Sequence, residues 1–345
     1  MKSLLAPILL TMSLNSNLIA PNFDSVVYYV NSNNVEMTEV NYNKLIQLGY
    51  TKRELEFLTL DEYIEKSGFI VKNTIVDTYV QKTTINEMGT PNSTKQIISK
   101  QQALLEMEQK NNIHTRTATE SSNYVDEYKE FSFFGSTIID SDGNKKYFVK
   151  VNMDWLITPE QRYTDIIALI ISDAVQIESQ NSNIIFDSSF IYTKYTSSYY
   201  STSLGVIQNE ADTSDYIIRV DNLDTNDYEY IVTEGLTVQY DLPPLDSHVQ
   251  ENGSNYYYEY HEIYSNFSFS LSACFYPTST TVISAPFAGA YFHSRIGLGI
   301  NMEGIQLSLF SPFIEFPFGL NIINYSETIG SYFLLNDADI NWPIC

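Results

Sequence analysis

Apolar and polar positions alternate in short runs from about residue 125 onward, which is the pattern of half-buried β-strands. The runs are rich in Tyr, Phe, Ile, Val and Thr, and Asn, Asp, Gly and Pro separate them. Asp142-Gly143, between the alternating runs 131–139 and 146–156, predicts a hairpin. Because neither a helical pattern nor a repeat of fixed period intervenes, we predict a large antiparallel, β-sandwich-like domain over residues 120–345.

Residues 38–68 carry the signals of short helices instead. The pattern predicts a helix over 41–48 that stops at Gly49, a residue suited to the left-handed position past a helix end. Two Thr-x-x-Glu capping boxes then begin at Thr51 and Thr59, each before apolar residues at helical spacing. Gly68 ends the run.

The segment that follows is mixed, and it leads to a domain boundary. Residues 69–86 alternate as in a strand, and 95–108 have apolar positions that predict a helix. The polar stretch 111–122 has no periodicity and is the expected boundary. We therefore predict an α+β fold, in which a small α-rich N-terminal module over 21–115 precedes the β-domain.

The start of the chain resembles a secretory leader. One lysine is followed by an apolar stretch from Leu4 to Leu14, which is too short to cross a bilayer. We expect residues 1–20 to be a signal peptide and the protein to be extracellular, with no stable membrane span. The alternative is an apolar N-terminal element of a cytoplasmic protein.

Composition excludes several classes of protein. The 345 residues include 42 Asp and Glu against 19 Lys and Arg, a formal charge of −23, so a nucleic-acid partner is not expected. Aromatic residues make up 14% of the chain, including 27 Tyr, which excludes a disordered acidic tail.

The two cysteines are too few for a disulfide scaffold or a cysteine-based zinc module. In an oxidising compartment Cys274 and Cys345 can form a disulfide that pins the chain end to a strand. The interpretation that we favour is a buried Cys274 that packs as a small apolar residue, with an incidental thiol at Cys345.

Candidate catalytic chemistry is sparse, and we expect no catalytic residues, no metal site and no cofactor. The chain has no Gly-x-Ser-x-Gly elbow, no Walker-type phosphate loop and no His-Glu-x-x-His motif. A pair formed by His261 and His293 across a sheet would be the one histidine arrangement with metal-binding potential. A glycosidase needs two carboxylates flanking a cleft, for which Asp154, Asp165 and Glu262 are the candidates.

The run from Tyr256 to Tyr260 is the most unusual feature of the sequence. In a strand, Tyr256, Tyr258 and Tyr260 lie on one face and Tyr257 lies on the other. Exposed tyrosines offer a platform for a sugar or a protein. Cross-strand aromatic packing explains the same run without any function, and it is the commoner reason for such a pattern.

Three segments resemble uncharacterised secreted β-rich proteins of Gram-positive Firmicutes. The clearest is Trp-x-x-x-Pro-x-x-Arg-x-x-Asp-Ile, here Trp155 to Ile166. The others are Gly49-Tyr50-Thr51 with its following Glu, Leu-Thr and Glu-Tyr pairs, and Leu242-Pro243 before an aromatic strand. The resemblance implies secretion and a β-rich body, and no activity. We expect Trp155 to anchor the core, and Arg162 to pair with Asp165.

Two functions from different classes remain. The first is a non-enzymatic secreted protein that binds a protein or glycan partner through its β-domain. The second is a pore-forming or membrane-active secreted toxin, because the Ser/Thr-rich alternation of 193–204 and 265–272 suits amphipathic membrane strands. A glycosidase is a third and weaker candidate.

Overall fold

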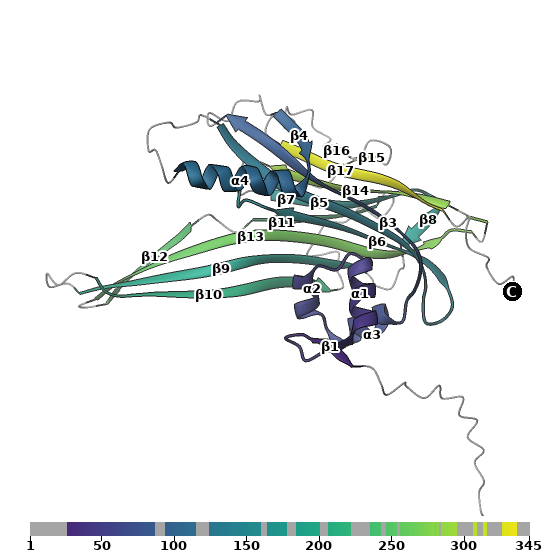
Figure 1. Ribbon diagram of the computed structural model, residues 1–345, viewed down its shortest axis with the longest axis horizontal. Helices are drawn as coiled ribbons and strands as arrows, with labels where there is room; N and C mark the ends of the chain where they lie inside the picture. Colours follow the sequence, from purple (N-terminus) through teal and green to yellow (C-terminus); the bar gives the residue numbers. More distant parts are fainter. Residues whose placement is uncertain are drawn as a thin grey trace, which may run out of the picture.

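The computed structural model describes most of the chain after residue 25 (Figure 1). In β9 beyond Ser188, in β10, in β12 and in β13 before Tyr264, it describes the backbone only. The described ranges are 26–86, 94–114, 124–159, 164–177, 184–200, 206–221, 235–242, 246–253, 256–279, 281–282, 284–294, 306–308, 313–315 and 326–336.

Strands dominate the described residues, and every strand pairing within them is antiparallel, which confirms the predicted β-rich class. The helices are α1 (Glu39–Gln47), α2 (Lys52–Phe57), α3 (Leu60–Ser67) and α4 (Lys100–His114). The strands are β1 (Val27–Val30), β2 (Glu36–Thr38), β3 (Ile70–Asn86), β4 (Thr94–Ile98), β5 (Tyr124–Ile139), β6 (Lys145–Trp155), β7 (Thr164–Ile171), β8 (Val175–Ile177), β9 (Ile185–Tyr200), β10 (Val206–Asp221), β11 (Gly235–Asp241), β12 (Asp246–Gly253), β13 (Tyr256–Pro277), β14 (Ser284–Ser294), β15 (Gln306–Ser308), β16 (Phe313–Glu315) and β17 (Ser326–Asn336).

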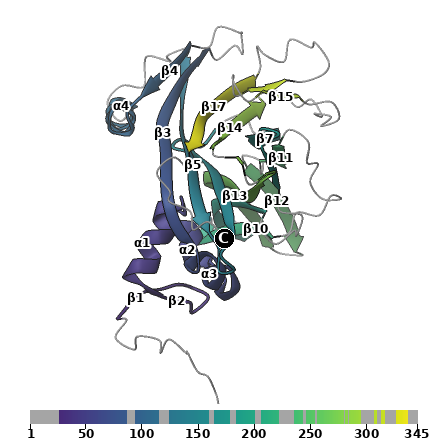
Figure 2. The ribbon, with the colours of Figure 1, turned by 90° about the vertical axis from the view of Figure 1, so that its right-hand side faces the viewer.

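Two sheets form the body of the protein (Figure 2). The larger has nine strands in the order β10-β9-β13-β6-β5-β3-β4, with β12 and β8 also paired to β13. The smaller has four strands in the order β11-β7-β14-β17. The main core lies between them, because its buried side chains come from both sheets, for example Val151 on β6 and Leu169 on β7.

Alternation along β6 explains which face of the large sheet is apolar. Val149, Val151 and Met153 belong to the main core, whereas Lys150 and Asn152 between them belong to the opposite face. That opposite, outer face meets the N-terminal helices with both polar residues and the apolar Phe148. The expected hairpin joins β5 to β6, and Gly143 in its turn has a φ of +85°.

The N-terminal helices enclose a second, smaller core. Leu45, Leu48, Leu55 and Leu58 from α1, α2 and their flanking residues pack with Phe148 of β6. The first capping box is complete, since Thr51 and Glu54 exchange both hydrogen bonds. The second is half formed, because Thr59 accepts the backbone N–H of Glu62 while the Glu62 carboxylate bonds elsewhere.

The structure differs from the sequence analysis on either side of residue 98. Thr94–Ile98 is a strand, whereas the apolar pattern predicted a helix from residue 95. Adjacent β-branched Ile97 and Ile98 suit a strand, and β3 supplies the pairing edge, so helix α4 begins only at Lys100. β3 itself pairs along its length with β5, so the large sheet runs across the boundary expected at 111–122.

One end of the large sheet extends beyond the second sheet (Figure 1). It is formed by the far ends of β9, β10 and β13 together with β12, in the order β10-β9-β13-β12. We call this part, residues 191–200, 206–215, 246–253 and 256–265, the projecting end.

Candidate functional site

The contact between the N-terminal helices and the large sheet begins at Gly49. This residue follows α1 with a φ of +93°, as a helix-ending glycine should. A Cβ at this position would also lie 2.6 Å from the Phe134 ring, so no side chain fits. The carbonyl oxygen of Gly49 accepts a 2.7 Å hydrogen bond from Nδ2 of Asn152 on the outer face of β6.

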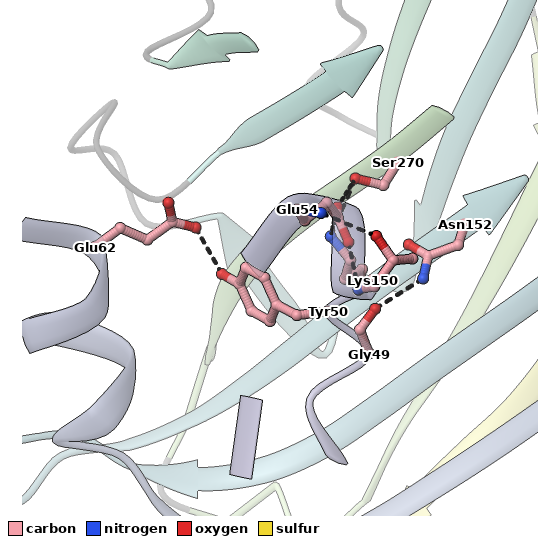
Figure 3. A network of polar contacts seen from close by, with 8 residues as sticks. Gly49, Tyr50, Glu54, Glu62, Lys150, Asn152 and Ser270 are labelled. Carbon is pink, nitrogen blue, oxygen red and sulfur yellow. Dashed lines mark hydrogen bonds and ion pairs between the residues drawn. The ribbon is translucent and has the colours of Figure 1, made fainter. Parts of the chain in front are cut away.

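A buried ion pair lies next to this contact (Figure 3). Nζ of Lys150 on β6 is 2.5 Å from Oε1 of Glu54 on α2, and Oγ of Ser270 on β13 donates to the same oxygen at 2.5 Å. The other oxygen, Oε2, accepts the backbone N–H of Thr51 at 2.7 Å. One carboxylate therefore caps its own helix and ties that helix to two strands of the sheet.

Aromatic rings complete this cluster. Nζ of Lys150 lies 4.7 Å from the centre of the Tyr50 ring, a cation–π distance. The Tyr50 hydroxyl donates a 2.8 Å hydrogen bond to Oε1 of Glu62, which is why the second capping box lacks its reciprocal bond. The ring of Tyr50 also stacks on Phe148. The cluster thus links α1, α2, α3 and the outer face of the large sheet.

The cluster contains a serine beside a lysine, a pair that can supply a nucleophile and a base in other proteins. Here Nζ of Lys150 lies 3.0 Å from Oγ of Ser270. Burial works to raise the pKa of Glu54, but the charge of Lys150 and the bonds from Lys150 and Ser270 outweigh it and lower that pKa. The carboxylate therefore stays ionised and holds Lys150 as its counter-ion. Ser270 is only 3% exposed, so the arrangement joins elements and offers no room to a substrate.

A second buried network crosses the main core between the two sheets. Nδ1 of His293 on β14 is 2.6 Å from Oδ1 of Asp165 on β7, and the two residues are directly opposite in the strand register. The hydroxyl of Tyr291 donates to the other oxygen of Asp165, and Nε1 of Trp155 on β6 donates to that hydroxyl at 3.0 Å. Nζ of Lys129 lies 4.4 Å from the centre of the Trp155 ring.

This network resembles an acid–base pair in composition but is closed to solvent. Asp165 is 2% exposed and His293 is fully buried. Burial, with the neighbouring charge of Asp165, raises the pKa of Tyr291 well above its usual value. Nε2 of His293 has no hydrogen-bond partner among the described residues. Within those residues no group of three or more His, Cys, Asp or Glu side chains is placed to hold a metal ion.

Asp154, one of the glycosidase candidates, has a raised pKa. It lies directly opposite Glu130 on β5, on the outer face of the large sheet. Burial, aided by the charges of Glu130 and Glu54, raises the pKa of Asp154 to about 6. Glu130 is itself paired with Lys100 of α4 at 2.5 Å. Of the other candidates, Asp165 lies in the closed network between the sheets, and Glu262 lies on β13 in the projecting end.

The remaining residues singled out by the sequence fall in different places. Trp155 lies in the main core at 3% exposure. Cys274 is buried in the smaller core, while Cys345 lies outside the described residues, as does Arg162. The proposed disulfide and the proposed Arg162–Asp165 pair therefore stay predictions. His261 and His293 belong to different sheets.

The tyrosine run forms part of β13 in the projecting end. Tyr256 is opposite Tyr200 of β9, and Tyr257 is opposite Tyr199. Tyr258 and Tyr260 follow at the two-residue period, so they share a face with Tyr256. That face continues the apolar face of the body, because Tyr264, further along the same series, packs against the main core. The structure thus aligns tyrosines of β9 and β13, which the sequence could not pair.

Sequence reasoning missed Lys150, Ser270 and Tyr291 as members of buried networks. Each was part of a strand pattern, where a polar residue between apolar ones reads as solvent-facing. Glu54 was recognised for its cap alone. One signal could have indicated the contact of Glu54 with the sheet. Helix α2 is too short to be stable without tertiary contacts, so its side chains had to pack against another element.

Comparisons with known proteins do not assign the chain to a family. No family model matches the chain, and no curated protein matches it. Among solved structures, the chain is similar to the NetB toxin of Clostridium perfringens in its membrane-inserted form, with 9% sequence identity and a TM-score of 0.18. That match covers 77% of this chain and 98% of the toxin chain. No helix among the described residues is long and apolar enough to cross a bilayer.

Proposed function

We propose that this protein is a secreted, non-enzymatic interaction protein that binds a neutral glycan through the tyrosine-rich projecting end. A single observation carries the proposal, namely the register that sets tyrosines of β13 opposite tyrosines of β9 beyond the second sheet. Sugar rings present apolar faces that stack on tyrosine, and tyrosine gives contact area at a small cost in side-chain entropy. We also propose that the N-terminal helices form a module that packs as a unit on the outer face of the large sheet.

The absence of a usable catalytic arrangement among the described residues supports binding over catalysis. The two buried networks are closed, and they join elements to one another. A protein with formal charge −23 also repels anionic surfaces, so a neutral partner is favoured.

A second candidate is a membrane-active protein, and the β9–β10 hairpin favours it. Lys194 of β9 is opposite Asp212 of β10, and Glu210 lies on the same face at the two-residue period. The other face holds no charged residue over 192–199 of β9 and 206–214 of β10, and Asp215, opposite Ile191, lies just beyond that stretch. Its residues there are Thr193, Tyr195, Ser197 and Tyr199 of β9, and Asn209, Ala211 and Thr213 of β10. A stretch of about 9–11 residues per strand is what a bilayer requires.

The second Ser/Thr-rich segment considered for a membrane-active function lies in the body of the protein. Within residues 265–272, Phe267, Phe269 and Leu271 lie in the main core, and Ser270 bonds to Glu54. This segment is therefore bound into the body on both faces. A membrane-active role would fall to the β9–β10 hairpin.

One experiment separates the two candidates. The protein is applied to a printed array of neutral glycans and, in parallel, to dye-loaded liposomes of zwitterionic phosphatidylcholine. The first proposal expects retention on defined glycans that is lost in the triple variant Tyr256→Ser/Tyr258→Ser/Tyr260→Ser and kept in Tyr28→Ser, a control at an exposed tyrosine outside the projecting end.

The liposome arm has its own variant. Dye release that survives the triple variant but is lost in Thr193→Asp/Tyr195→Asp, which places charges within the stretch of that face that has none, identifies the second candidate. An empty glycan array, or equal retention of the triple variant, contradicts the first proposal.

A further inference from the structure

A group of apolar side chains is exposed around strand β1. Val26 and, within β1, Val27, Tyr28 and Val30 are between 47% and 84% exposed. Val40, in the helix α1 that directly follows β2, is 74% exposed. Single exposed apolar residues are ordinary, but a group of them on adjoining elements indicates an interaction surface. We call these residues the β1 surface.

Strand β1 lies in a stretch of chain without charge. Residues 26–35 contain no Asp, Glu, Lys or Arg, whereas the whole chain has a formal charge of −23. Two copies of so acidic a chain repel each other where charged surfaces meet, so an uncharged surface is where they can associate. The β1 surface also lies at the outer end of the N-terminal helices, on the side away from the smaller sheet (Figure 1, Figure 2). A second copy can therefore approach it.

The backbone of β1 can contribute to such a contact. One edge of β1 pairs with β2, and no strand of the described residues pairs with the other edge. An open edge presents N–H and C=O groups that another strand can bind. The β1 sequence, Val27-Tyr28-Tyr29-Val30, reads the same in both directions. An antiparallel second copy therefore sets valines and tyrosines against one another, and such cross-strand pairs stabilise a sheet.

We propose that the β1 surface is the interface of a homodimer, in which the β1 strands of two copies pair antiparallel about a two-fold axis. A two-fold dimer uses the same surface of both copies, as this self-complementary strand requires. Glu36 and Glu39 follow the uncharged stretch, so repulsion between the copies weakens the dimer at low salt. The proposal stands apart from glycan binding, because β1 and the projecting end consist of different elements.

The test is analytical ultracentrifugation of the full chain over a series of protein concentrations. The expected result is a monomer–dimer equilibrium whose dimer fraction rises between about 0.1 M and about 1 M NaCl, because salt screens the repulsion between copies. Val26→Asp/Val40→Asp should weaken the dimer by more than about tenfold, because each copy then brings two charges into an apolar interface. Ile97→Asp, which charges a 63% exposed apolar residue of β4, should leave the dimer unchanged and is the matched control.

Val26 and Val40 are the most exposed residues of the β1 surface, so their substitution should leave the fold intact. Far-UV circular dichroism checks this, and Val26→Asp alone replaces the double variant if the latter unfolds. The proposal is overturned if the chain is a monomer at every concentration and salt, if the charged variant dimerises as tightly as the unmodified chain, or if Ile97→Asp weakens the dimer equally. A monomer that floats with phosphatidylcholine vesicles, and loses this in the charged variant, would assign the β1 surface to lipid and also overturn it.

Discussion

Asp154 is a carboxylate whose surroundings oppose its ionisation. It is partly buried beside Glu130, and its pKa is raised to about 6, against about 3.9 in an unfolded chain. An acid with a raised pKa in the folded state costs stability once it ionises. The cost is absent below about pH 4, grows between pH 4 and 6, and is complete above pH 6.

The variant Asp154→Asn removes this charge while keeping a polar side chain. We expect it to raise the free energy of unfolding by about 1–3 kcal/mol at pH 7.5 and to leave it nearly unchanged at pH 3.5. Urea unfolding at the two pH values measures both. Asp142→Asn, in the exposed hairpin turn, is the control and should show no such difference. If Asp154→Asn destabilises the protein at pH 7.5, the hydrogen bond from Ser268 outweighs the charge.

At the scale of elements, the Glu54–Lys150 pair decides how the helices sit on the sheet. Both side chains are almost wholly buried, so neither charge can be left without the other. Removing one partner of a buried pair costs about 3–5 kcal/mol, whereas replacing both with apolar residues is often close to neutral. Ser270 and Thr51 add hydrogen bonds that depend on the same carboxylate.

A double-mutant cycle tests this role. We expect Glu54→Gln and Lys150→Met each to lower the free energy of unfolding by about 3 kcal/mol or more, and the double variant to lower it by much less than their sum. The Lys82–Glu106 pair, between β3 and α4, has side chains that are 18% and 27% exposed and provides the comparison, and Lys82→Met should cost about 1 kcal/mol or less. Additive effects of the two buried changes would show that the pair does not couple α2 to the sheet.

At the scale of the whole molecule, the net charge of −23 affects how strongly the protein binds to charged surfaces. Like charges repel within a Debye length, which is about 10 Å at 0.1 M salt and about 3 Å at 1 M salt. The protein should therefore not sediment with vesicles rich in phosphatidylserine at low salt in the presence of a chelator. It should sediment with cationic vesicles, and it should be released as the salt concentration rises.

Phosphatidylcholine vesicles are the neutral reference in this cosedimentation measurement. Firm binding to the anionic vesicles at low salt, with the chelator present, would show that a local feature overrides the net charge. Binding that requires a divalent ion would instead indicate bridging between two acidic surfaces.

The sequence by itself determined the features that depend on neighbouring residues. The left-handed position of Gly49, the complete capping box of Thr51 and Glu54, and the turn at Gly143 each involve a few consecutive residues. Their hydrogen bonds follow from backbone angles that particular residue types favour. The alternating pattern likewise predicted strands, because burial on one face requires a period of two.

Only the tertiary structure decided which distant residues meet. Glu54 finds Lys150 and Ser270, and Asp165 finds His293, because strand order and register bring these segments together. Tertiary packing also changed two features that the local sequence predicted. The Glu62 carboxylate accepts a hydrogen bond from Tyr50 and does not cap its own helix, and residues 94–98 pair with β3 as a strand. A local pattern fixes which face of an element is apolar, but the partner on that face is chosen by the packing of the whole chain.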